Sequence, residues 1–138
     1  MALPRTTAAL ALVAVAIAAA GCGADPVEKA NIGKVRAVVN QFSQASDASA
    51  CNLLTGDALS NVYGGFNPDV ARARANCVNK SAAFKGEPID ITKASVIDNQ
   101  TAKVNALSKD GKFTYSITVR RPGKQWLIDQ ITLHKVRP

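Results

Sequence analysis

The apolar residues of this chain change their spacing at Pro88, and this change restricts the fold more than any other feature of the sequence. Before it, Val35, Val39 and Phe42 recur every three to four residues, which is the spacing of one face of an α-helix. After it, apolar and polar residues alternate along 113–119, as in a strand with one buried face. The sequence therefore predicts an α+β protein with helices first and a sheet second.

Capping signals define where the helices begin. Asp25 can accept hydrogen bonds from the first free backbone N–H groups, and Pro26 suits the first helical position. The predicted helices cover about 26–45, 48–54 and 56–63, and a further helix starts with Asn67-Pro68-Asp69 and runs to about Lys80. The inward side of the last helix is predicted to consist of Val70, Ala73, Cys77 and Val78.

Turn signals separate the predicted strands. Asp110-Gly111 favours a hairpin, and Pro122-Gly123 marks the next turn. The predicted strands are 89–97, 102–107, 113–119 and 126–133. The apolar phase of the last strand slips between Ile128 and Ile131, which predicts a β-bulge or a bend. We therefore expect N-terminal helices packed on a curved antiparallel four-stranded sheet.

The N-terminal segment has the pattern of an export signal. Arg5 precedes an apolar run from Ala8 to Ala20, and Ala19-Ala20-Gly21-Cys22 resembles the lipobox of bacterial lipoproteins. Lipoboxes usually have Leu three residues before the cysteine, where this chain has Ala19. The resemblance implies a signal peptide over 1–21, a Cys22 acylated on its sulfur as by palmitate, a tether over 22–25 and one domain over 26–138. Ordinary cleaved secretion and an uncleaved N-terminal anchor are the alternatives.

The remaining cysteines, Cys51 and Cys77, form an even pair. An exported chain folds in an oxidising compartment, where such a pair favours a disulfide. A free or redox-active pair is the alternative. A metal site needs more ligands than these, and the lone histidine, His134, lies far away in the sequence. The sequence therefore predicts a disulfide, no metal and no cofactor.

The net charge of +7 restricts the class of partner. A basic chain suits nucleic acid, anionic lipid or an acidic polymer, but an exported protein does not normally meet cytoplasmic nucleic acid. We therefore expect a membrane contact through the acyl anchor and no nucleic acid. An anionic or amphiphilic small molecule or an envelope protein is the expected further partner. The alternative is that the charge is scattered and serves solubility alone.

Aromatic and acidic residues near the strands are candidates for a pocket. The aromatic candidates for its lining are Tyr63, Phe66, Phe113, Tyr115 and Trp126, although aromatics at strand spacing are more often core residues. A buried strand aspartate with a raised pKa would be a candidate base. The aspartates on or beside strands are Asp90, Asp98, Asp110 and Asp129. Solvated positions are the alternative for each, and no catalytic residue is assigned.

Several short motifs carry a resemblance to a known family. They are Val38-Val39-Asn40-Gln41-Phe42, Ala50-Cys51-Asn52-Leu53-Leu54-Thr55, Ala75-Asn76-Cys77 and Lys124-Gln125-Trp126-Leu127-Ile128-Asp129. With this order of elements, residues 26–134 resemble the nuclear transport factor two-like (cystatin-like) superfamily, in particular its small actinobacterial lipoproteins. The resemblance implies a cone-shaped fold whose pocket serves catalysis, small-molecule binding or protein contact in different members. Its isomerases use a buried carboxylate and a tyrosine, and that motif does not map onto this chain.

These observations predict a non-enzymatic protein of a bacterial cell envelope. It is expected on the extracytoplasmic face of the cell membrane, lipid-anchored, with a domain that binds a ligand or a partner. An isomerase or dehydratase with a pocket carboxylate, and a structural accessory subunit, are the alternatives. An enzyme needs a carboxylate facing the pocket, whereas a binding protein needs an open apolar cavity.

Overall fold

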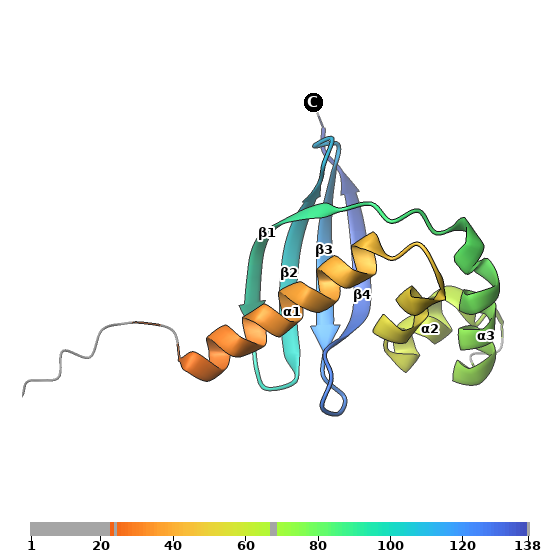
Figure 1. Ribbon diagram of the computed structural model, residues 1–138, viewed down its shortest axis with the longest axis horizontal. Coiled ribbons are helices and arrows are strands. Elements are labelled where there is room, and N and C mark those ends of the chain that lie inside the picture. Colours follow the sequence, from red (N-terminus) through yellow and green to blue (C-terminus); the bar gives the residue numbers. More distant parts are fainter. Residues whose placement is uncertain (1–22, 24, 67–68, 138) are drawn as a thin grey trace, which may run out of the picture.

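The computed structural model describes residues 23, 25–66 and 69–137. Within these residues the helices come first and an antiparallel sheet follows, with its strands in the order β1-β2-β3-β4 and not closed into a barrel (Figure 1). The α+β fold predicted from the sequence is therefore confirmed.

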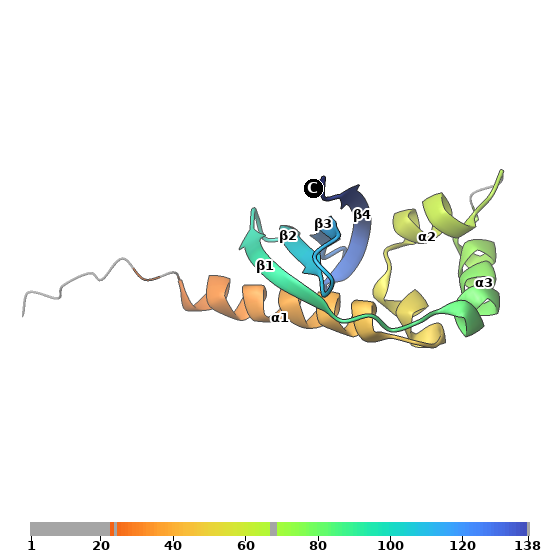
Figure 2. The ribbon, with the colours of Figure 1, turned by 90° about the horizontal axis from the view of Figure 1, so that it is seen from above.

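The helix α1 (Pro26–Gln44) lies across one face of the sheet, as Figures 1 and 2 show. The Asp25 side chain accepts a hydrogen bond from the backbone N–H of Val27 at 2.8 Å, and Pro26 occupies the first turn. The buried side of the helix consists of Asn31, Val35, Val38 and Val39. Burial of this stripe fixes α1 against the sheet.

The other helices lie beyond the β4 edge of the sheet (Figure 1). They are the 3₁₀-helix η1 (Ala48–Leu53), α2 (Gly56–Tyr63), α3 (Val70–Lys80) and the short 3₁₀-helix η2 (Ser81–Ala83). Side chains of Asp47, Thr55 and Asp69 cap η1, α2 and α3.

The expected inward side of α3 is half wrong. Ala73 and Cys77 are fully buried, whereas Val70 and Val78 are 43% and 45% exposed. The neighbours of α3 are α2, η1 and η2 rather than the sheet, and they cover only a narrow stripe of it. Periodicity identifies a helix face, but the width of the covering layer decides how much of that face is buried.

The sheet has one face toward α1, here called the inner face. Its strands are β1 (Ile89–Val96), β2 (Thr101–Ser108), β3 (Phe113–Arg120) and β4 (Leu127–Lys135). Ala102 pairs with Val119, and Val104 with Ile117, so these buried side chains share the inner face. Gly111, with a φ of 70°, makes the turn between β2 and β3 that Asp110-Gly111 predicts.

The predicted bulge in β4 is confirmed. Val119 pairs with Ile128, but the preceding Thr118 pairs with Gln130, so Asp129 has no partner in the ladder. A second bulge interrupts β1 at Thr92. Helices and sheet share one core, whose buried members are Val35, Val38, Val39, Cys51, Leu54, Ala58, Leu59, Ala73, Cys77, Ala102, Val104, Ile117, Val119, Trp126 and Ile128.

Candidate functional site

A cavity of about 400 Å³ lies where the last turn of α1 and η1 meet the inner face of the sheet. This volume is in the range of small-molecule sites. Most of its lining is apolar: Val39, Phe42, Ala45, Ala50, Leu54, Tyr63, Cys77, Ala83, Phe84, Ile89, Tyr115, Ile117 and Ile131. Ser43, Lys85 and Glu87 supply polar groups. We call it the inner cavity.

A larger hollow of about 950 Å³ adjoins the inner cavity between α2 and β4. Phe42, Leu54, Tyr63 and Ile131 line both spaces, so the two meet at these side chains. The rest of the larger hollow is more polar, with Asp57, Ser60, Asn61, Arg120, Asp129 and Gln130 in its wall. Together they form a groove with an apolar end and a polar end.

The bulged Asp129 ties α2 to the sheet beside this groove. Its carboxylate accepts a hydrogen bond from Thr55 Oγ1 at 2.8 Å and lies 3.3 Å from Arg120 Nε. The same Thr55 caps α2 through the N–H of Ala58, and its own N–H donates to the Ile128 carbonyl at 2.8 Å. These contacts fix α2 against β4. Asp129 is thus an ion-paired, hydrogen-bonded carboxylate rather than a free base.

The other strand aspartates lie away from the groove. Asp90 pairs with Lys109 at the surface. A hydrogen bond from the Gln100 backbone lowers the pKa of Asp98, and one from the Ser108 hydroxyl lowers the pKa of Asp110. A lowered pKa makes a carboxylate a weaker base, whereas a base working near neutrality needs a raised pKa.

The five aromatic candidates are not brought together. Tyr63 and Tyr115 line the inner cavity, and burial raises the pKa of the Tyr63 phenol. Phe66 is fully exposed, because it lies on the turn after α2. Phe113 faces the same side of β3 as Tyr115 but lies beyond the cavity lining.

Trp126 belongs to the core rather than to the groove. It is only 3% exposed, and the Arg121 guanidinium lies 5.2 Å from the centre of its ring. Its indole N–H has no hydrogen-bond partner among the described residues. Trp126 lies just before β4 and is a member of the hydrophobic core.

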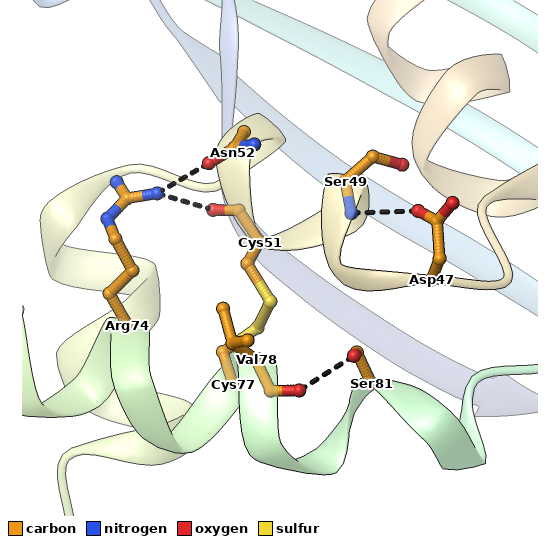
Figure 3. The surroundings of a disulfide bond; sticks show 8 residues. All are labelled: Asp47, Ser49, Cys51, Asn52, Arg74, Cys77, Val78 and Ser81. Carbon is orange, nitrogen blue, oxygen red and sulfur yellow. Dashed lines mark hydrogen bonds between the residues drawn. A yellow bond between two sulfur atoms is a disulfide. The ribbon is translucent and has the colours of Figure 1, made fainter.

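The predicted disulfide between Cys51 and Cys77 is present, and it joins η1 to α3 (Figure 3). Both side chains are fully buried, and Cys77 is part of the inner cavity wall. Arg74 reinforces the junction by donating to Asn52 Oδ1 at 2.9 Å and to the Cys51 carbonyl at 3.4 Å. Cys22 lies outside the described residues.

Sequence reasoning missed several groove residues. Phe42 and Leu54 were assigned only to helices, although both line the two spaces. Glu87 was not considered, yet it is the carboxylate in the lining of the inner cavity, where it is exposed. Glu87 is held near the cavity by a hydrogen bond from its backbone N–H to the Ser43 carbonyl at 2.8 Å. No local pattern in the sequence signals that contact.

Among the residues that the structure describes, no cluster of three or more His, Cys, Asp or Glu side chains could hold a metal ion. No helix in residues 23, 25–66 and 69–137 is long and apolar enough to cross a membrane. No family model, no curated protein and no solved structure matches this chain.

Proposed function

We propose that this chain is a lipid-anchored protein of a bacterial cell envelope, and that its domain binds an amphiphilic molecule without transforming it. The inner cavity carries this proposal. It offers about 400 Å³ of mainly apolar space and joins a more polar hollow at Tyr63 and Ile131. An apolar chain would occupy the inner cavity, and its polar end would lie toward Arg120 and Asn61.

The anchor in this proposal is Cys22. α1 begins at Pro26, so only a short tether would separate the acylated cysteine from the folded domain. A protein anchored in this way on the extracytoplasmic face would meet amphiphiles of the membrane. We also propose membership of the nuclear transport factor two-like superfamily, supported by a long first helix across an antiparallel meander.

An isomerase or dehydratase is less well supported than a binding protein. It would need a buried carboxylate with a raised pKa in the cavity. Glu87 is exposed. Asp129 is engaged by Thr55 and Arg120. Neither carboxylate is therefore both buried and free of a partner, as a base in the cavity would need to be.

A structural accessory subunit is the second candidate, and exposed apolar side chains favour it. Val62, near the end of α2, is 67% exposed, and Phe66, on the turn after α2, is fully exposed. Large exposed apolar residues are typical of protein contacts when they gather in one place. In that case Phe66→Asp would release a partner during extraction from native membranes and leave amphiphile binding unchanged.

The test of the binding proposal uses protein extracted gently from native membranes. Native mass spectrometry should find a chain that begins at Cys22, carries acyl mass and lacks the two hydrogens of the closed disulfide. Binding is then measured with a fluorescent fatty acid as probe and with dodecanoate as competitor. Saturable binding at one site is the expected result.

Matched variants locate the site. Ile131→Glu places a charge in the wall shared by both spaces, and we expect it to weaken probe binding about 10-fold or more, because a carboxylate resists transfer to an apolar site. Leu133→Glu is the control, since Leu133 lies on the same face, is 53% exposed and is outside the lining of both spaces. Equal losses in both variants, or no saturable binding in the wild type, would refute the proposal.

A further inference from the structure

The exposed side of α1 is positively charged along its length. Lys29, Lys34 and Arg36 are all exposed, and the helix has no Asp or Glu from Lys29 to its end at Gln44. Among the described residues, none of these cations makes an ion pair. Their charge is therefore available to a partner.

These cations border a flat strip of small side chains. At 3.6 residues per turn, Lys29 and Arg36 lie on one flank of the exposed side and Lys34 on the other. Gly33 and Ala37 lie between the flanks, both exposed. A side chain at Gly33 would meet nothing within 4 Å, so this strip is open. We call the strip with its flanking cations the outer face of α1.

The fold leaves this face uncovered. The buried stripe with Val35 and Val38 points to the sheet, and Figure 2 shows the sheet on one side of α1 only. Acidic residues lie near the two ends of the helix. Asp25 and Glu28 are in its first turn, and Asp25 and Asp47 are engaged as caps. Glu87 lies at the other end, where its backbone N–H donates to the Ser43 carbonyl. A broad surface of opposite charge could thus lie along the middle of the helix.

We infer that the outer face of α1 docks on anionic phospholipid head groups. This inference rests on the proposed anchor at Cys22. A chain extends at most about 3.3–3.6 Å per residue, so an acyl chain on Cys22 would hold Asp25 within about 11 Å of the bilayer surface. The cations follow immediately, and each strengthens attachment to an anionic surface about fivefold. Acyl anchors need such a second signal when only one chain is attached.

The orientation of α1 on the bilayer determines how far the inner cavity lies from the head groups. α1 has 19 residues, which corresponds to a length of about 28 Å. An upright helix would hold its last turn, with Phe42 and Ser43 in the cavity wall, about that far from the bilayer. A helix lying flat brings the same turn to the head groups, with the cavity behind it on the sheet side of α1. The proposed amphiphile would then travel about one helix diameter, about 10–12 Å, between bilayer and cavity instead of about 28 Å.

The experiment measures the depth of a spin label at Ala37 in the mature protein, reconstituted into nanodiscs. Ala37→Cys gives one reactive thiol, because Cys51 and Cys77 are bridged and Cys22 would be blocked by its acyl group. Accessibility to a water-soluble nickel chelate should fall about threefold in bilayers containing phosphatidylglycerol relative to pure phosphatidylcholine. Molar salt should restore it, since the Debye length drops to about 3 Å. A label at the exposed Ser116, on the opposite face of the sheet, should not change.

Matched charge variants separate this face from net charge. Lys34→Gln with Arg36→Gln should abolish the change at Ala37. Lys135→Gln with Arg137→Gln removes the same charge from exposed sites at the far end of the chain and should leave it intact. An acylated chain whose Ala37 label is equally accessible in both bilayers would overturn the docking alone.

Other outcomes are equally decisive. A chain without acyl mass would overturn the anchor and this inference with it, while probe binding in the cavity would still test the binding proposal separately. Protection of Ala37 in neutral lipid that rises with protein concentration would show that a second copy, rather than lipid, covers the face.

Discussion

Opening the disulfide between Cys51 and Cys77 should lower the free energy of unfolding by about 3.5 kcal/mol. The bridge joins residues separated by 26 positions. For a closed loop of about that length, the chain-entropy model gives a loss of about 12 cal/mol/K, which is about 3.5 kcal/mol at 25 °C. With an entropy of unfolding near 2.1 cal/mol/K per residue, a domain of about 110 residues would lose about 15 °C in Tm.

The effect should act mainly on the unfolded chain. Both cysteine side chains are fully buried, so reduction leaves two thiols in nearly the same packing. Replacing both by alanine also removes buried sulfur, and we expect a further loss of about 1 kcal/mol for each, by analogy with a buried methylene. Comparing reduction with Cys51→Ala/Cys77→Ala therefore separates loop entropy from packing.

Urea unfolding followed by circular dichroism, with and without reductant, measures both quantities. The alanine variant is the control, because reductant should not change its stability. A loss below about 1 kcal/mol on complete reduction of the wild type would refute the entropic reasoning. It would mean that the unfolded chain keeps η1 and α3 together without the bridge.

Two further predictions concern the backbone and the cavity. Gly86→Ala should destabilise the domain by about 1–3 kcal/mol, because a Cβ there would overlap the Gln44 carbonyl. Gly33→Ala should stabilise it by about 0.5–1 kcal/mol, because Gly33 lies in a helix and a Cβ there meets nothing within 4 Å. Urea unfolding should show changes of opposite sign in the free energy of unfolding of the two variants. Burial raises the pKa of Tyr63, so the unfolded chain ionises first above pH ~10 and stability should fall as the pH rises through the folded-state pKa. Ultraviolet titration should show that the ionisation of Tyr63 moves to higher pH when dodecanoate is bound, and Tyr63→Phe should remove this ionisation. An ionisation of Tyr63 that dodecanoate does not shift would place the ligand elsewhere.

Local signals in the sequence predicted the elements well because they act over a few residues. Asp25 caps the helix that it was expected to cap, and α2 has the predicted bounds of 56–63. The segment 48–54 was predicted only as a short helix, and the structure makes 48–53 a 3₁₀-helix. An apolar pattern of six residues does not distinguish the two helix types, whose hydrogen bonds differ by one residue.

The groove was harder to predict because it depends on gaps between distant elements. Tyr63 and Tyr115 were proposed on type and spacing, and they line the inner cavity. Trp126, chosen by the same reasoning, fills the core, and Phe66 is exposed. An aromatic side chain offers a large apolar surface, but its residue type does not indicate which other segment of the chain covers that surface. That information lies in contacts such as the one between Glu87 and Ser43.

One residue of β4 determines much of the groove. An unbroken strand would follow the inward Ile128 with Gln130 on the inner face and would turn Ile131 outward, because side chains alternate. The bulge adds Asp129, so Ile131 pairs with Ile117, and its side chain lines both the inner cavity and the larger hollow. The freed Asp129 side chain meanwhile binds Thr55 and holds α2 at the groove wall. The same insertion, which the sequence signals as a phase slip between Ile128 and Ile131, thus supplies the apolar wall and fixes the helix opposite it.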